Sequence, residues 1–148
     1  MNRFLKTTLL IAVLVGFALA SFAQAEEAAK VYTADELAAE AKANTNCMDV
    51  AASKAAVDAG KFAVILDVRE PKEYKAGHIP GAINIPRGVL EFKIAEKIAD
   101  KATPILVYCK KGGRGCLCCV QLTKMGYNAV TNLDGGWLAW EKAEYPVE

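Results

Sequence analysis

The sequence contains a single histidine, His78, and it has neither an internal repeat nor a low-complexity linker. A single imidazole excludes metal sites that need two or more histidines. The absence of a linker predicts one domain, and 148 residues are enough to bury a hydrophobic core. Charge of one dominant sign is also lacking, because 18 Lys and Arg residues are balanced by 17 Asp and Glu residues. We therefore expect no nucleic acid among its partners.

The longest apolar run, residues 9–22, is shorter than the ~20 residues that a membrane span needs. It follows Arg3 and Lys6 and precedes small residues that end at Ala23 and Ala25. This order of cations, apolar run and small residues is typical of a secretory signal. The sequence predicts a cleaved signal peptide over residues 1–25 and a mature domain over residues 26–148. We expect a periplasmic protein without a stable membrane span, and an uncleaved anchor is the alternative.

The rest of the chain alternates between strand and helix patterns. Continuous apolar runs at residues 61–68 and 104–109 are typical of strands buried on both faces of a parallel sheet. Thr33 and Glu36 form a capping-box pattern that opens an alanine-rich helix. Shorter strands are predicted near residue 31 and at residues 82–86 and 129–136, and further helices at residues 47–60, 69–78, 89–100, 116–126 and 137–143. This alternation predicts an α/β domain with a mainly parallel sheet.

Cys109 ends a predicted strand and precedes a glycine-rich turn and a helix. Reactive groups gather in the loops at the carboxyl ends of parallel strands. The glycines let backbone N–H groups turn inward around an anion, and the following helix adds the positive end of its dipole. Lys110, Lys111 and Arg114 add three positive charges. These features favour the thiolate form of Cys109, so we expect a nucleophile rather than a buried structural cysteine.

The spacing between Cys109 and Arg114 distinguishes two enzyme classes that share a strand–Cys–loop–Arg–helix arrangement. Cysteine-dependent phosphatases have one residue more between the cysteine and the arginine, and a histidine usually precedes their cysteine. Here Arg114 follows Cys109 after four intervening residues, and Tyr108 precedes it. A smaller ring of amides suits a single sulfur atom better than a phosphoryl group. The loop therefore favours sulfur chemistry over phosphatase or arsenate reductase activity.

Three motifs together resemble the single-domain rhodanese-like family, which includes thiosulfate sulfurtransferases. They are LDVREPKEYKAGHIPGAINIP at residues 66–86, VYCKKGGRG at residues 107–115 and LDGGWLAW at residues 133–140. The resemblance extends from about Val31 to the C-terminus. It implies the rhodanese-like fold, a five-stranded parallel sheet with helices on both faces.

The resemblance also implies sulfurtransferase chemistry without a cofactor. Cys109 would take sulfur from an anionic donor such as thiosulfate or polysulfide and hold it as a persulfide. The acceptor would be cyanide, a thiol or a protein. Lys111 matches a position where a lysine assists anionic donors in some members. By position, the persulfide cradle would consist of Lys110, Lys111, Gly112, Gly113 and Arg114.

Glu73 departs from the pattern of some thiosulfate-using members, which carry a second cation in this segment. Its side chain fits a place in the pocket and a solvated helix face equally well. The departure supports an alternative of another class, a persulfide carrier or thiol-redox partner protein that does not turn over thiosulfate. A rhodanese-like binding module without catalysis is disfavoured because the cysteine is present.

Four further residues are expected to support the site. Asp67 and Arg69 follow a buried strand, and we expect an ion pair or a brace for the loop rather than direct catalysis. His78 fits a hydrogen-bonded turn better than a catalytic base. Trp137 is expected in the core together with Trp140, at helical spacing, rather than at the mouth of the pocket.

Cys116, Cys118 and Cys119 lie at the start of the helix that follows the loop. The favoured interpretation is that they replace alanine as small apolar residues. One alternative is a resolving thiol for the nucleophile or a disulfide with Cys47, which an oxidising compartment would permit. Zinc or another soft metal is a further alternative, although this cysteine spacing is not a usual zinc pattern. Five cysteines leave at least one without an intramolecular disulfide partner.

Overall fold

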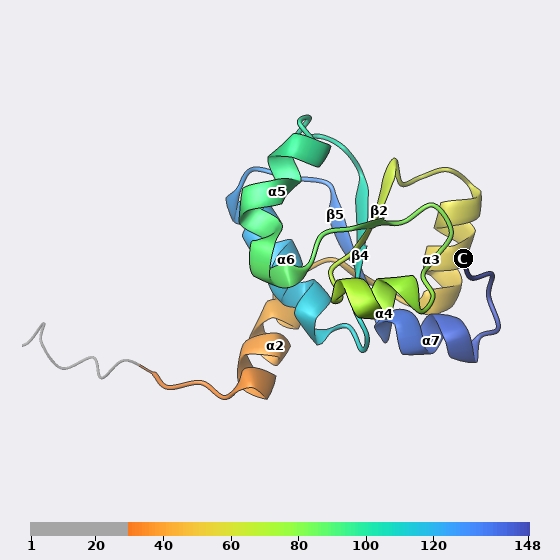
Figure 1. Ribbon diagram of the computed structural model, residues 1–148. Coiled ribbons are helices and arrows are strands. Elements are labelled where there is room, and N and C mark those ends of the chain that lie inside the picture. Colours follow the sequence, from red (N-terminus) through yellow and green to blue (C-terminus); the bar gives the residue numbers. More distant parts are fainter. Residues whose placement is uncertain (1–29) are drawn as a thin grey trace, which may run out of the picture. The chain divides into compact units, whose positions relative to one another are not determined.

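The computed structural model describes residues 30–148, which Figure 1 shows as a coloured ribbon. The predicted signal peptide lies outside the described residues. The chain divides into two units, residues 1–31 and residues 32–148, and the helices and strands given below belong to the second. Within residues 30–148, no helix combines the length and the apolar character that crossing a membrane requires.

Five parallel strands form one sheet in the order β1-β5-β4-β2-β3, which confirms the predicted sheet. All four residues of the central strand β4 are buried, as expected for a strand that is covered on both faces. The strands are β1 (Cys47–Met48), β2 (Val64–Asp67), β3 (Ile83–Asn84), β4 (Ile105–Tyr108) and β5 (Val130–Leu133).

Helices cover both faces of the sheet (Figure 1). They are α2 (Ala34–Ala43), α3 (Val50–Asp58), α4 (Pro71–Lys75), α5 (Leu90–Lys97), α6 (Gly113–Lys124) and α7 (Gly136–Lys142), with a 3₁₀ turn η1 (Arg87–Val89) before α5. One core packs α5 and α6 against β2 and β4, and Ile94 and Leu122 are fully buried in it. A second core packs α3 and α7 against the other face around Trp140. The helix α2 packs on α6 and begins with the predicted capping box of Thr33 and Glu36.

The edge strand β1 differs from the sequence prediction. Residues 30–33 form no strand, and the fifth strand is Cys47–Met48, which the sequence pattern assigns to a helix. A strand of two residues shows no periodicity of its own, and it forms here because it pairs with Asn132 and Leu133 of β5. The helix α3 then starts at Val50, since the Asp49 side chain accepts a hydrogen bond from the amide of Ala52 at 2.8 Å.

The helix α6 starts earlier than predicted, at Gly113 instead of Cys116. The residue before it, Gly112, has a φ of 102°, which side chains rarely adopt. The chain therefore turns sharply at Gly112, and Gly113, Arg114 and Gly115 belong to the first helical turn. The positive end of the α6 dipole thus lies within the loop that follows Cys109.

Candidate active site

Cys109 lies directly after β4 at the carboxyl edge of the sheet, and 1% of its surface is exposed. Its Sγ accepts a hydrogen bond from the backbone N–H of Gly112 at 3.2 Å. Because Gly112 has a positive φ, this contact depends on a glycine at that position. Lys110 and Lys111 are exposed. The loop thus binds the sulfur with a backbone amide, while its two lysines face the solvent from which an anion would arrive.

The turn Asp134–Trp137 holds this loop in shape. The Trp137 N–H donates to the carbonyl of Cys109 at 2.8 Å, and the Leu138 N–H donates to the carbonyl of Lys110 at 3.1 Å. Gly136 has a φ of 58°, and a Cβ at this position would overlap the carbonyl oxygen of Cys109. The turn therefore binds the loop carbonyls close to the N-terminus of α7 and away from the sulfur. In the sequence the two glycines are part of the LDGGWLAW motif, and this motif does not indicate their contact with the loop.

Gly115 makes a second close approach, between the first turn of α6 and the buried residue Asn132 of β5. A Cβ at Gly115 would overlap Oδ1 of Asn132, and it would lie 3.7 Å from the backbone nitrogen of Cys109. Glycine at this position therefore allows α6 to begin next to Cys109. Asn132 is an additional site residue that the sequence does not indicate, because its contact with Gly115 exists only in the folded chain.

Arg114 forms an ion pair with Glu73 of α4. Its Nη1 and Nη2 donate to the two carboxylate oxygens at 3.0 and 3.1 Å. The hydrogen bonds from Arg114 hold the pKa of Glu73 below its usual value, and those same bonds raise the pKa of Arg114. Both groups are therefore charged at neutral pH. Glu73 faces the site, and it neutralises part of the positive charge that Arg114 would otherwise offer to an anion.

Asp67 and Arg69 form a buried ion pair, as predicted. The Arg69 Nε donates to both carboxylate oxygens of Asp67 at 2.9 and 3.0 Å, and its Nη2 donates to Asp67 at 2.6 Å and to the carbonyl of Gly77 at 2.7 Å. Burial lowers the pKa of Arg69, but the hydrogen bond and charge of Asp67 more than offset this effect and raise it. The guanidinium also lies 4.5 Å from the centre of the Trp137 ring. The pair thus connects the segment after β2 to α7, which also binds the Cys109 loop.

His78 lies in a hydrogen-bonded turn that holds the C-terminal residue. Its ring stacks on Tyr74 at a centroid distance of 3.8 Å, and its Nδ1 lies 3.1 Å from the Tyr74 carbonyl oxygen. Its backbone exchanges two hydrogen bonds of 2.9 Å with Glu148. These contacts give His78 a structural role, which is the role that the sequence favours.

Two cavities border the Cys109 loop. One, of about 310 Å³, is lined by Arg69, Glu73, Lys110 and Trp137 among others. Trp137 therefore belongs to a cavity wall as well as to the core, whereas Trp140 is buried in the core.

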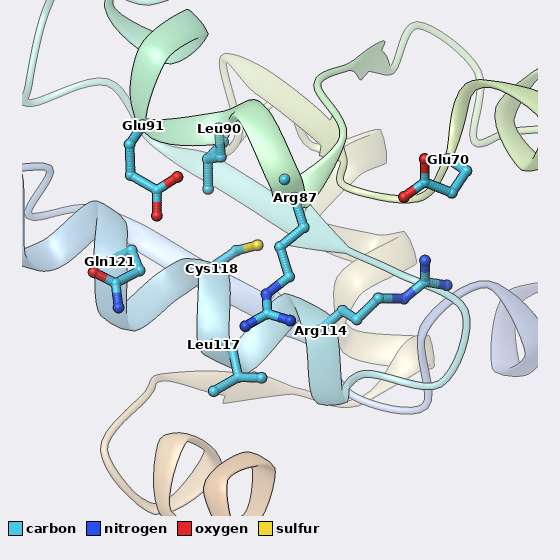
Figure 2. Close-up of a pocket in the computed structure, with 9 residues that line it drawn as sticks. Glu70, Arg87, Leu90, Glu91, Arg114, Leu117, Cys118 and Gln121 are labelled. Atoms are coloured by element: carbon cyan, nitrogen blue, oxygen red, sulfur yellow. The ribbon is translucent and has the colours of Figure 1, made fainter. Parts of the chain in front are cut away.

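The other cavity measures about 410 Å³ and is shown in Figure 2. Arg87 and Arg114 extend along it, and the thiol of Cys118 points toward Arg87 (Figure 2). Glu70 and Glu91 line the same cavity, so its walls carry charges of both signs. An anion that reached the loop through this cavity would meet acidic as well as basic side chains.

The cysteines of α6 have different surroundings. Cys118 and Cys119 lie in the hydrophobic core with Leu122, and burial raises the pKa of both thiols. Cys116 is also buried, but its Sγ lies 3.9 Å from that of Cys47. In the part of the chain that the structure describes, no group of three or more His, Cys, Asp or Glu side chains is placed to hold a metal ion. Two of the three cysteines thus occupy the core, and the third faces another thiol.

Comparison with known proteins assigns these features to a family. The rhodanese-like domain matches residues 49–143, which contain the Cys109 loop, the Glu73–Arg114 pair and the turn that follows β5. The chain belongs to the rhodanese-like domain family. Its parallel sheet with helices on both faces agrees with the fold that the sequence predicts for this family.

Three relatives show the range of this family. A "Sulfurtransferase" of Allochromatium vinosum is 32% identical over 57% of this chain and 77% of its own length. An HTH-type transcriptional regulator of Mycobacterium tuberculosis is 40% identical over 62% of this chain, which spans only 39% of the regulator. A solved structure from Rhodopseudomonas palustris, described as a protein of unknown function and possible tyrosine phosphatase, has a TM-score of 0.70 and 27% identity, covering 80% of this chain and 96% of its own. The rhodanese-like domain places this chain in a sulfurtransferase family whose members also serve other functions.

Proposed function

We propose that this rhodanese-like protein is a sulfurtransferase that carries sulfur as a persulfide on Cys109. The observation that carries the proposal is the hydrogen bond of 3.2 Å from the Gly112 amide to Cys109 Sγ, within a loop in which Arg114 follows the cysteine after four residues. Such a loop binds one sulfur atom with a backbone amide, and it is one residue shorter than the phosphate-binding loop of cysteine-dependent phosphatases. The loop length therefore supports sulfur transfer over the phosphatase activity suggested for the Rhodopseudomonas protein.

The proposed reaction has two displacement steps. In the first, the Cys109 thiolate attacks the outer sulfur of thiosulfate, a new S–S bond forms, and the bond to the sulfonate group breaks. Sulfite leaves with the bonding electron pair, and Cys109 becomes a persulfide. In the second step, cyanide or a thiolate attacks the outer persulfide sulfur and expels the Cys109 thiolate. Each step moves one electron pair, and no external oxidant or reductant is consumed.

The loop would stabilise the negative charge that is present at every stage. The Gly112 amide already donates to the thiolate position, and the N-terminus of α6 adds partial positive charge. Lys110 and Lys111 are exposed and would attract an anionic donor. In the persulfide, the outer sulfur would carry the charge, and the same amide and lysines would remain close to it.

The Glu73–Arg114 pair supports a second candidate, a persulfide carrier that is loaded by a donor other than thiosulfate. Arg69 is already neutralised by Asp67, and Arg114 is partly neutralised by Glu73. A dianion such as thiosulfate would therefore rely mainly on Lys110, Lys111 and Arg87. Arg87 shares its cavity with Glu70 and Glu91. The persulfide of a partner protein carries less charge at its reacting sulfur than thiosulfate and depends less on these cations, and a protein would then be the sulfur acceptor as well.

The proposal includes a periplasmic location after removal of residues 1–25. It is supported by the order of Arg3, Lys6, the apolar run and the small residues before Ala25. Expression of the full chain in a bacterium, followed by intact mass of the periplasmic fraction, tests it. A mass that begins after Ala23 or Ala25 is expected, and a full-length chain in the membrane fraction would refute it.

A turnover assay tests the sulfurtransferase proposal. Purified protein is supplied with thiosulfate or inorganic polysulfide, with cyanide as acceptor, and thiocyanate is measured. We expect thiocyanate with at least one donor and none above background with Cys109→Ser. Cys119→Ala serves as the matched control, because this cysteine is buried in the core and lines neither of the two cavities that border the loop. Turnover by polysulfide alone favours the carrier, and equal rates in wild type and Cys109→Ser would refute both candidates.

A further inference from the structure

Cys47 and Cys116 form a thiol pair that the proposed sulfur transfer does not use. Cys47 belongs to the edge strand β1, and Cys116 lies in the first full turn of α6. Their Sγ atoms lie 3.9 Å apart, although the two residues are separated by 69 positions in the sequence. A disulfide bond requires about 2.05 Å between sulfur atoms. The sulfur atoms thus lie close to van der Waals contact, and they would have to approach each other by about 1.9 Å to form the bond.

The two thiols differ in access, which gives them different roles in disulfide chemistry. Cys47 is half-buried and can meet a reagent from solution, whereas 1% of Cys116 is exposed. Burial raises the pKa of the Cys116 thiol, and the neighbouring Cys47 raises it further. The charge of the Lys42 ammonium partly opposes this rise in the pKa of Cys116. The Nδ2 of Asn132 also lies 3.8 Å from Cys47 Sγ. The pair therefore consists of an accessible attacking thiol and a covered resolving thiol.

The other cysteines are held in different places. Cys109 Sγ accepts the Gly112 amide, and Cys118 and Cys119 lie in the core with Leu122. Among the cysteines of residues 30–148, Cys47 and Cys116 are the one pair whose sulfur atoms lie in contact. The contact thus selects one partner for Cys47 from the cluster.

We propose that Cys47 and Cys116 are a reversible dithiol–disulfide site that reacts with low-molecular-weight disulfides. In the first step, the Cys47 thiolate attacks a disulfide R–S–S–R, a mixed disulfide forms on Cys47, and one R–S⁻ leaves. In the second step, the Cys116 thiolate attacks the Cys47 sulfur and expels the second R–S⁻. The two cysteines lose two electrons and two protons, and the reagent is reduced to two thiols. A dithiol reductant reverses both steps.

The position of the pair connects it to the site without involving Cys109. The Cys116 amide donates to the carbonyl of Gly112 at 2.9 Å, in the turn whose own amide binds the Cys109 sulfur. Cys47 pairs with Asn132 of β5, which lies two residues before the turn that binds the loop carbonyls. The disulfide would therefore fix the start of α6 to the edge of the sheet. The proposal does not rest on the proposed function, because neither step uses the nucleophile.

Thiol counting in a Cys109→Ser protein tests the site separately from sulfur transfer. The full-length chain is equilibrated with oxidised glutathione, quenched with acid, alkylated under denaturing conditions and digested with trypsin. Four cysteines remain in this protein, and we expect two of them to become resistant to alkylation. The expected product joins the peptide of residues 43–54 to the peptide of residues 115–124. Dithiothreitol should restore four alkylated thiols.

Matched variants identify the partner within the second peptide, which contains three cysteines. In the Cys109→Ser background, Cys118→Ala and Cys119→Ala should retain the cross-link. Cys116→Ala should abolish it and leave a glutathione adduct on Cys47, because the resolving thiol is missing. Four free thiols after oxidation would overturn the proposal. A cross-link to Cys47 that persists in Cys116→Ala would overturn it as well.

Discussion

Substitution of Glu73 by Gln should improve the use of thiosulfate, because it removes the negative charge that pairs with Arg114. Gln keeps the length of the side chain and one oxygen acceptor for the guanidinium, which now receives two bonds of 3.0 and 3.1 Å. Arg114 would stay near its present place with its charge free to face the donor. The variant therefore changes the charge at the loop more than its geometry.

The size of the effect follows from the charges involved. A donor on the far side of the guanidinium would lie about 7 Å from the Glu73 carboxylate, where the repulsion of a dianion amounts to about 1 kcal/mol in water. Removal of this repulsion corresponds to about a fivefold rise in kcat/KM at low ionic strength. Screening at physiological salt roughly halves the energy and leaves about a twofold rise. The gain should therefore shrink as salt is added.

Thiocyanate formation measured at several thiosulfate and salt concentrations tests this effect. Glu96→Gln on α5 is the matched control, since its exposed carboxylate pairs with Lys93 at 3.9 Å and lies outside both cavities that border the loop. It changes the net charge equally and should leave kcat/KM unchanged. A fall in kcat/KM for Glu73→Gln, or a gain that does not depend on salt, would refute the electrostatic explanation. Either result would mean that Glu73 acts mainly by positioning Arg114.

Three further results are expected. Gly136→Ala should lower kcat/KM at least tenfold, because its Cβ would overlap the Cys109 carbonyl oxygen. The control Gly60→Ala has a similar φ of 65° with open space around it, so it should cost only the backbone strain of about 1 kcal/mol, which urea unfolding measures. Equal losses of activity in the two variants would contradict this explanation. Oxidation of Cys47 and Cys116 to a disulfide should raise the free energy of unfolding by about 4 kcal/mol at most, because the bond closes a loop of 69 positions in the unfolded chain. An oxidised protein that is less stable than the reduced one would show that the bond strains the fold. Burial raises the pKa of Cys116, so its thiolate is scarce at neutral pH. Attack of this thiolate on the mixed disulfide should therefore accelerate about tenfold for each unit by which the pH is raised. A rate that does not depend on pH in stopped-flow or quenched samples would contradict this.

The sequence predicts the fold well where the residues that make up a pattern lie close together along the chain. The apolar run that contains β4 and the capping box of Thr33 and Glu36 are such patterns, and both are confirmed. The edge strand Cys47–Met48 is not predictable in this way, because two residues form a strand only through pairing with β5. The start of α6 is missed for another reason: its first three residues include two glycines, and glycine has a low helix propensity.

The sequence predicts the chemical groups of the site better than their pairing. The position of Cys109 at a strand end, the glycine turn and the Asp67–Arg69 pair follow from local order along the chain. The Glu73–Arg114 pair joins residues 41 positions apart, and the contact between Gly136 and the loop is also long-range. Such contacts depend on how the strands are ordered in the sheet, which no local pattern in one sequence specifies.

The central claim is that Cys109 carries sulfur, and intact mass spectrometry tests it most directly. The reduced protein is incubated with thiosulfate or polysulfide, desalted and measured before and after cyanide. We expect a gain equal to one sulfur atom, located on the peptide of residues 102–110, lost on cyanide treatment and absent in Cys109→Ser. An unchanged mass with both donors, or an adduct that remains in Cys109→Ser, would contradict it.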